Sequence, residues 1–434
     1  MKSNKFWAVV SRTLAAATLM LIVTLLLVPG AWAAGKFKTL YQFTGGADGA
    51  VPFGTLIFDQ AGNLYGTTGG AMISPGPTPG NVFELTPNAD GTWTESVLYS
   101  FTGGSDGGSP NAGLIFDQAG NLYGTTQWGG SSNCQYGCGV VFELTPNADG
   151  AWTESVLYSF TGGKDGGQPW ASLIFDAVGN LYGTTPGGGN PNCHGLFSGC
   201  GVVFKLAPNG DGTWTESVLH GFTGGKDGEM PEAGLIFDQT GNLYGTARSG
   251  GRTMPHCEDW MGTGCGVVFK LTPNPDGRWK EKVLYSFTGQ DGYWPMAAPT
   301  FDAAGNLYGT TNHGGTYLYG AAFRLTPKAN GVWKEKVLHS FNMKDGFGPG
   351  LGALIFDSAG NLYGTTVQGG AYGYGVVFKL KPISSGKRWK ETALHTFKEA
   401  GSWGGLTFDA AGNLYGTTSG DGITTFGSVF EITR

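Results

Sequence analysis

The stretch F-D-Q-A-G-N-L-Y-G-T-T, residues 58–68, decides the fold, because its pattern F-D-x-x-G-N-L-Y-G-T-T recurs in closely similar form along the chain. The copies follow one another at intervals of 52 to 64 residues, and their opening phenylalanines are Phe58, Phe116, Phe175, Phe237, Phe301, Phe356 and Phe408. A regular period of this size indicates an array of similar supersecondary units. One array therefore fills most of the 434 residues.

Each repeat predicts four β-strands. Within the motif, D-x-x-G separates two runs of β-forming residues: the aspartate can accept hydrogen bonds at a type I turn, and the glycine supplies the positive φ that closes a hairpin. Two further runs follow, such as G-V-V-F-E-L at 139–144 and W-T-E-S-V-L-Y-S-F at 152–160. The latter alternates between two unlike sets of side chains, which is the period of a strand.

The two ends of the array predict that it closes on itself. A fourth-strand run follows the third in six repeats, whereas the last repeat ends after its third strand, S-V-F-E at 428–431. The run K-T-L-Y-Q-F at 38–43 matches the missing strand and precedes the first hairpin. A closed ring can use it to complete the last blade, which removes the edges that a linear solenoid must cap. We therefore expect residues 34–434 to form one all-β domain: a seven-bladed β-propeller with four antiparallel strands per blade, the last completed by the N-terminal strand.

If the fourth strand is outermost, the first strand lines a central channel. Small residues precede it in most copies, as crowding at an axis requires: Gly54, Ala112, Gly113, Ala171, Ala233, Gly234, Gly404 and Gly405. Pro299 replaces the leucine of this strand in the fifth repeat, which a strand paired on one side tolerates. Gly66 and its equivalents lie in mid-strand, where a missing side chain indicates close approach of another element.

The first 33 residues predict a secretory signal peptide. Lys2, Lys5 and Arg12 form a basic start, residues 14–28 an apolar core, and A-W-A at 31–33 a cleavage pattern. The alternative is an uncleaved anchor, but the apolar stretch is shorter than the ~20 residues that a spanning helix needs. We therefore expect a mature chain from near Ala34 that is secreted, periplasmic or at the cell surface, with no membrane span after cleavage.

The six cysteines form three local pairs, each between the second and third strands of a repeat: Cys134 with Cys138, Cys193 with Cys200, and Cys257 with Cys265. Their equivalent positions, even number and predicted export favour three disulfides. Zinc is the competing interpretation, although the spacings lack the paired histidines or C-x2-C knuckles of structural zinc sites.

Composition and charge exclude some functions. With 79 glycines and 13% aromatic residues, the chain has the composition of a turn-rich all-β protein. A formal net charge of -6 without a basic cluster in the sequence argues against nucleic acid as a partner, because phosphates require concentrated Lys and Arg. We expect a monomer.

The signature G-x-L-I-F-D-x-x-G-N-L-Y-G-T-T with G-V-V-F-x-L resembles that of the GloVer tandem-repeat proteins, described as "choice-of-anchor" because members carry varied C-terminal anchoring segments. The resemblance covers essentially all of the predicted mature chain. It implies an exported repeat protein, and it implies no established activity, so no catalytic residue is carried over. This sequence has no recognisable anchor, and we therefore expect release or a periplasmic location.

A site that needs asymmetry should lie where the repeats differ. The connections between the second and third strands and the crossovers from the fourth strand to the next first strand should share one face, and both are long and variable. Aromatic residues on this face could stack on sugars or anchor a protein partner, or could instead pack inward. The candidates are Trp128, Tyr136, Trp170, Phe197, Trp260, Tyr293, Trp294, Tyr317, Tyr319, Tyr372, Tyr374 and Trp403. The repeated tryptophans Trp93, Trp152, Trp214, Trp279, Trp333 and Trp389 are predicted to pack between blades.

Carboxylates and histidines give weaker signals. Six crossover aspartates could bind calcium, but Asp-Gly more often forms a turn, which we favour: Asp48, Asp106, Asp165, Asp227, Asp291 and Asp345. His220, His339 and His395 replace a fourth-strand tyrosine and are predicted to be structural. His194, His256 and His313 lie in variable loops, and His256 with Glu258 and Asp259 is a candidate for acid–base chemistry without a supporting motif.

Taken together, these patterns predict a noncatalytic, exported propeller that binds a glycan or an extracellular protein through its aromatic loop face. The alternatives are a carbohydrate-active hydrolase or lyase with a site at the channel mouth, and a structural component of a surface or matrix. No cofactor is expected apart from the weaker calcium hypothesis.

Overall fold

The computed structural model describes residues 35–433 apart from 71, 74–75, 78, 194–196, 255–256, 258–262, 384–385 and 387. The predicted signal peptide, residues 1–33, lies outside this range. Residues Phe37–Thr433 form one compact unit. Within the described part of the chain, no helix is long and apolar enough to cross a membrane.

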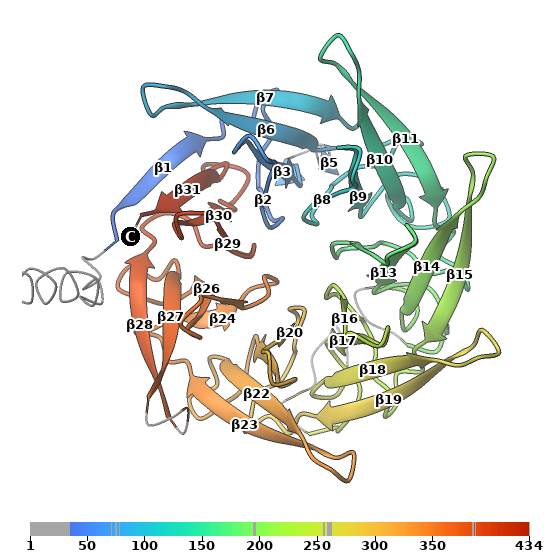
Figure 1. Ribbon diagram of the computed structural model, residues 1–434, viewed down its shortest axis with the longest axis vertical. Helices are drawn as coiled ribbons and strands as arrows, with labels where there is room; N and C mark the ends of the chain where they lie inside the picture. The colour runs from blue at the N-terminus through green and yellow to red at the C-terminus, as the bar shows by residue number, and fades with distance from the viewer. Residues whose placement is uncertain are drawn as a thin grey trace, which may run out of the picture. The chain divides into compact units, whose positions relative to one another are not determined.

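Seven antiparallel sheets, the blades, follow one another along this unit, and Figure 1 shows them arranged around a common centre. Blade 1 consists of β2 (Ile57–Phe58), β3 (Leu64–Thr68), β6 (Asn81–Pro87) and β7 (Trp93–Ser100). Blade 2 consists of β8 (Ile115–Phe116), β9 (Leu122–Thr126), β10 (Val140–Pro146) and β11 (Trp152–Ser159). Blade 3 consists of β12 (Ile174–Phe175), β13 (Leu181–Thr185), β14 (Val202–Pro208) and β15 (Trp214–Gly221). Blades 4 and 5 are β16 (Ile236–Phe237), β17 (Leu243–Ala247), β18 (Val267–Pro273), β19 (Trp279–Ser286); and β20 (Thr300–Phe301), β21 (Leu307–Thr311), β22 (Ala321–Pro327), β23 (Trp333–Ser340). Blades 6 and 7 are β25 (Ile355–Phe356), β26 (Leu362–Gln368), β27 (Val376–Ile383), β28 (Arg388–Thr396); and β29 (Thr407–Phe408), β30 (Leu414–Thr418), β31 (Ser428–Ile432), β1 (Phe37–Gln42).

The ring closes through the N-terminal strand, as predicted. β1 pairs antiparallel with β31, with Phe37 opposite Ile432 and Tyr41 opposite Val429. In Figure 1 the blue β1 accordingly lies beside the red β31. The backbone N–H of Phe43 donates to the Gly427 carbonyl at 3.0 Å, which continues this pairing beyond the strand. The seven-bladed fold is therefore confirmed.

Two elements depart from the four-strand plan. β4 (Met72–Ile73) and β5 (Gly76–Pro77) form a small hairpin in the loop between β3 and β6. β24 (Phe347–Pro349), in the crossover into blade 6, pairs with the extended end of β26. Both lie in the variable connections, where the repeat pattern carries no information about pairing.

Neighbouring blades pack through one repeated aromatic trio. Tyr123 of β9 lies 5.0 Å from Phe175 and 6.5 Å from Trp214 of the next blade, measured between ring centroids. The tryptophan contacts recur at Trp93–Tyr415, Trp152–Tyr65, Trp279–Tyr182, Trp333–Tyr244 and Trp389–Tyr308. The prediction that these tryptophans pack between blades is confirmed.

Neighbouring atoms approach the repeated mid-strand glycines so closely that no side chain fits there. A Cβ on Gly124 would stand 2.6 Å from Cζ of Phe142, and the equivalent glycines meet the equivalent phenylalanines. Near the axis, a Cβ on Gly54 would stand 2.7 Å from the Ala112 carbonyl oxygen of the next blade. The innermost strand, of which β20 after Pro299 is one example, pairs on one side, and the expected crowding around the axis is confirmed.

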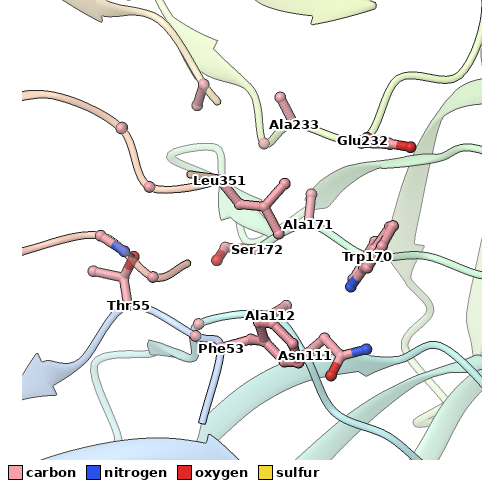
Figure 2. Close-up of a pocket in the computed structure, with 18 of the residues that line it drawn as sticks. Phe53, Thr55, Asn111, Ala112, Trp170, Ala171, Ser172, Glu232, Ala233 and Leu351 are labelled. Atoms are coloured by element: carbon pink, nitrogen blue, oxygen red, sulfur yellow. Dashed lines mark hydrogen bonds between the residues drawn. The ribbon is translucent and has the colours of Figure 1, made fainter. Parts of the chain in front are cut away.

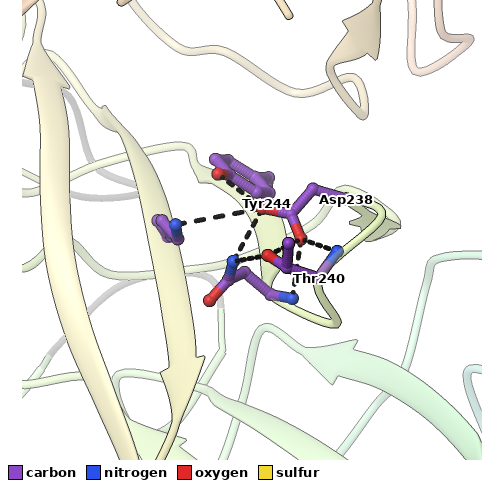
Figure 3. Close-up of polar contacts among 5 residues, drawn as sticks. Asp238, Thr240 and Tyr244 are labelled. Atoms are coloured by element: carbon purple, nitrogen blue, oxygen red, sulfur yellow. Dashed lines mark hydrogen bonds and ion pairs between the residues drawn. The ribbon is translucent and has the colours of Figure 1, made fainter. Parts of the chain in front are cut away.

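The D-x-x-G-N turns lie at the opposite end of the strands from the variable loops. In blade 4, shown in Figure 3, Asp238 accepts hydrogen bonds from the Asn242 backbone and side chain, from Thr240 and from the Tyr244 hydroxyl at 3.0 Å. Burial acts to raise the pKa of Asp238, but the hydrogen bonds from Asn242 and Thr240 hold it well below its ordinary value. The Asp59 series therefore forms turns, as predicted.

Candidate ligand-binding site

The loops between the second and third strands and the crossovers meet on one face of the ring, which we call the loop face. Short backbone bridges join them: Gly108 with Trp128, Glu229 with Ser249, and Tyr293 with His313. The variable segments therefore form a continuous, backbone-bonded surface rather than independent loops.

Three disulfides brace this face, as predicted: Cys134–Cys138, Cys193–Cys200 and Cys257–Cys265. In each pair the carbonyl of the second cysteine accepts a hydrogen bond from the crossover of the next blade. The donors are the N–H groups of Gln168 at 2.6 Å, Met230 at 3.0 Å and Trp294 at 3.1 Å. The disulfides therefore hold in place the carbonyls that accept these hydrogen bonds between neighbouring blades. We call these three hydrogen bonds the latch.

The three latching residues adopt an unusual backbone conformation. Gln168, Met230 and Trp294 have φ values of 59°, 54° and 58°, although each carries a side chain and precedes a proline. Left-handed backbone costs ordinary residues about 1 kcal/mol each. The hydrogen bonds to the preceding blade compensate for this strain. The backbone conformation of each crossover therefore depends on the contact between neighbouring blades.

A cavity of about 180 Å³ opens on the axis, lined mostly by the small residues that precede the first strands. In blades 1 to 4, larger side chains come from the position that follows the crossover proline, and this position carries four different residues. Figure 2 shows Phe53, Asn111, Trp170 and Glu232 around this mouth, with Leu351 reaching toward the centre. We call these five residues the channel mouth. It combines two aromatic side chains, an amide and a carboxylate on an otherwise repetitive ring.

The amide and the carboxylate of the channel mouth are each held by a neighbour. The Asn111 side-chain N–H donates to Gln127 Oε1 at 2.8 Å. Glu232 lies 4.0 Å from Arg248, and both side chains are buried. The Arg248 guanidinium in turn lies 4.3 Å from the ring centroid of Trp294. The mouth is thus a pre-organised polar and aromatic surface in which the carboxylate charge is paired.

The predicted aromatic residues divide into two groups. Half-buried rings pack on neighbours: Trp128 on Tyr136, Trp170 on Phe197, Tyr293 on Trp294, Tyr319 on Phe347 and Trp403 on Phe53. Exposed rings stand at loop tips, with 61% of Tyr136, 55% of Tyr317, 56% of Tyr372 and 46% of Tyr374 accessible to solvent. Trp260 lies outside the described residues. The structure therefore brings Trp170 to the channel mouth and leaves the four tyrosines at the rim.

The crossover aspartates are engaged in local turns. Asp106 accepts from the Thr102 N–H at 2.7 Å, from the Thr102 hydroxyl at 2.5 Å and from the Tyr99 hydroxyl at 3.2 Å. His220 and His339 replace this tyrosine and lie 3.4 Å and 3.2 Å from Asp227 and Asp345. Across the described part of the chain, no three His, Cys, Asp or Glu side chains gather as metal ligands would.

A fourth-strand glutamate of the next blade lies near each of these crossover aspartates, and sequence reasoning missed it. The fourth strand of one blade contacts both the crossover that leads into the next blade and the fourth strand of that next blade. We call this contact a seam. In the seam between blades 1 and 2, Glu154 lies near Asp106, and its Oε1 atom is buried without a hydrogen-bond partner among the described residues. Burial and the Asp106 carboxylate raise the pKa of Glu154 to about 7. The same glutamate recurs in six seams as Glu95, Glu154, Glu216, Glu281, Glu335 and Glu391.

The remaining candidates for chemistry do not form a described site. His256, Glu258 and Asp259 lie outside the described residues, as does His194. His313 packs against Tyr293 and Trp294, with ring centroids 5.4 Å and 4.8 Å away. Phe53, Asn111, Glu232 and Arg248 were also missed. Variability beside a repeated proline is a signal that could have identified the first three.

Among solved structures, the chain is similar to a luciferin-regenerating enzyme, with 11% identity over 92% of this chain and 95% of the other and a TM-score of 0.43. It is also similar to a periplasmic gluconolactonase of Pseudomonas aeruginosa, with 13% identity over 82% and 95% of the two chains and a TM-score of 0.46. A gluconolactonase of Xanthomonas campestris shows 14% identity, coverage of 92% and 89%, and a TM-score of 0.40. These similarities carry no argument about activity.

No curated protein matches the sequence. The family model described as "Gloeobacter/Verrucomicrobia repeat" matches residues 70–255 and 257–434, which is most of the chain and agrees with the resemblance seen in its repeats. The chain belongs to the Gloeobacter/Verrucomicrobia repeat family.

Proposed function

We propose that this protein is an exported, noncatalytic β-propeller that binds a glycan at the channel mouth of its loop face. The observation that carries the proposal is the asymmetry of the mouth. Phe53, Asn111, Trp170 and Glu232 line one cavity from a single variable position, while the repeated aromatic residues are used in blade packing.

The chemistry of the mouth suits a sugar. Aromatic rings stack on the apolar C–H face of a pyranose, and amide and carboxylate groups exchange hydrogen bonds with its hydroxyls. Trp170 and Phe53 supply the rings, and Asn111 and Glu232 supply the polar groups. The cavity of about 180 Å³ suits one sugar unit or a chain end rather than a long segment.

Export is part of the proposal. Three disulfides within short loops are typical of proteins that fold in an oxidising compartment. Together with the predicted signal peptide, they support a secreted, periplasmic or surface location.

A glycan array probed with the oxidised chain 34–434 tests the proposal, with calcium and again with a chelator. We expect at least one specific hit that Trp170→Ala weakens by about tenfold, since a lost ring contact of about 1.4 kcal/mol is one decade in affinity. Val178→Ala is the control, because Val178 is 79% exposed in a D-x-x-G-N turn at the other end of the strands. An array without hits, or an equal loss in both variants, would contradict the placement and favour a protein partner or a structural role.

One observation favours testing hydrolysis as well. Glu232 is the ionisable residue among the described residues that line the cavity. If a bound glycan were cleaved and Glu232→Gln abolished cleavage while binding persisted, the protein would be a carbohydrate-active enzyme.

A further inference from the structure

The seam between blades 6 and 7 differs from the other six. Each of those six seams is filled by a fourth-strand tyrosine or histidine, a crossover aspartate and a glutamate of the next fourth strand, as in Tyr99, Asp106 and Glu154. In seam 6/7, His395 stands at the tyrosine position and Phe37 of β1 at the glutamate position. The crossover of this seam contains no aspartate.

The same crossover is also shorter than the others. Residues 398–402 connect Phe397 to the segment that enters blade 7, whereas residues 102–110 make the equivalent connection into blade 2. The turn that covers the other seams is therefore missing. A pocket of about 260 Å³ lies there, lined by β1, by the end of β28 and by the loop that leads into β31.

One wall of this pocket is aromatic. The rings of Phe37 and His395 stack with centroids 3.7 Å apart and planes 8° apart, and Phe397 adjoins them. Burial and the charge of Lys398 lower the pKa of His395, so its imidazole is neutral near pH 7. A neutral imidazole offers one hydrogen-bond donor and one acceptor beside an apolar surface.

The rest of the lining and the rim are polar. Thr39, Gln42, Thr425 and Ser428 contribute hydroxyl and amide groups, and the Gln42 N–H is already directed to the Gly427 carbonyl at 2.9 Å. Lys398 and Glu399 stand exposed at the rim, with the Lys398 ammonium 5.5 Å from the ring centroid of Tyr372.

We propose that the pocket of seam 6/7 binds one pyranose unit of a glycan. A pyranose presents an apolar C–H face and a ring of hydroxyls, which match the Phe37–His395 wall and the polar side chains of the rest of the lining. An apolar peptide side chain would match the Phe37–His395 wall but would form no hydrogen bonds with the polar groups of the lining. The ligand class rests on the proposed function, but the pocket lies on the outer part of the ring and uses none of the channel-mouth residues.

Ligand-observed NMR and calorimetry with methyl glycosides of glucose, mannose, galactose, N-acetylglucosamine and glucuronic acid test this site. We expect at least one glycoside to bind. Thr39→Trp, which fills the pocket from an exposed position, should abolish that binding. Lys398→Ala should weaken it about tenfold, the effect of one lost hydrogen bond from a charged group. Lys344→Ala, at an exposed lysine in the crossover of the neighbouring seam, is the matched control and should bind as the wild type does.

His395→Tyr is a milder second variant, because it restores the residue that most other seams carry. If the thermal transition of Thr39→Trp shows a folding defect, His395→Tyr replaces it in the comparison. No binding of any glycoside to the wild type, or wild-type affinity in a folded Thr39→Trp, overturns the inference.

Trp170→Ala separates this site from the channel mouth. If the seam variants lose glycoside binding and Trp170→Ala retains it, the seam site is supported and the channel mouth is excluded as the place of binding. Loss in Trp170→Ala with retention in the seam variants supports the proposed function and overturns the seam site.

Discussion

The seam glutamates predict that this propeller is more stable in mild acid than in mild base. Burial, and next the carboxylate of Asp106, raise the pKa of Glu154 from 4.5 to about 7 in the folded protein. Glu95, Glu216, Glu335 and Glu391 reach about the same value, and the pKa of Glu281 is also raised. The five glutamates with this value therefore bind more proton in the folded than in the unfolded chain between about pH 4.5 and 7. The stabilisation is complete below the unfolded pKa, and stability falls as the pH rises through that window.

Replacement of one glutamate isolates the effect. A shift from 4.5 to about 7 corresponds to about 3 kcal/mol at 1.36 kcal/mol per pKa unit. The side chain is only half buried, so solvent screening reduces the expected contribution to ~1 kcal/mol. Glu154→Gln should therefore be ~1 kcal/mol more stable than the wild type at pH 8, because the amide carries no charge beside Asp106, and the advantage should disappear near pH 5.

Thermal unfolding followed by calorimetry across pH 5 to 8 measures this difference. A gain of ~1 kcal/mol corresponds to an increase of about 1 °C in Tm for a domain of this size. Glu399→Gln is the control, because Glu399 is exposed, and its stability should follow that of the wild type at each pH. A wild-type protein whose stability rises from pH 5 to 8, or a Glu154→Gln variant that is less stable at pH 8, would refute the reasoning.

Three further predictions concern the scaffold. Gly183→Ala places a Cβ 2.6 Å from Phe204 Cζ and should cost about 1 to 3 kcal/mol in urea unfolding, whereas Gly210→Ala, where no atom lies within 4 Å, should be close to neutral; equal costs would contradict the close-approach argument. Replacing Cys134 and Cys138 by alanine should lower the free energy of unfolding by about 2 kcal/mol and increase hydrogen exchange at Gln168, and unchanged exchange there would contradict the latch. Excess EDTA should leave Tm unchanged, since the hydrogen bonds to Asp106 and its equivalents already occupy these carboxylates, and a drop in Tm would restore the calcium hypothesis.

The candidate site could be predicted from the sequence only in part. The variable connections were expected to share a face, and the bridges between Gly108 and Trp128 and between Tyr293 and His313 bear this out. Which aromatic ring would be accessible could not be predicted, because each ring can pack on a neighbour that the sequence does not identify. Tyr293 and Trp294 pack on one another, whereas Tyr372 stays 56% exposed.

The sequence by itself determined the architecture, because the information for it is local and repeated. A hairpin turn, a mid-strand glycine and an alternating outer strand recur in each copy, and the displaced strand at 38–43 closes the ring. The tertiary structure alone decided what lies in the seams. Glu154 meets Asp106 in a contact that recurs in six seams, and Phe37 meets His395 in the seventh; both contacts join residues far apart in the sequence. Closure of the ring brings the two ends of the chain together, and the short crossover and the aromatic substitution coincide there to form a pocket that the other seams lack.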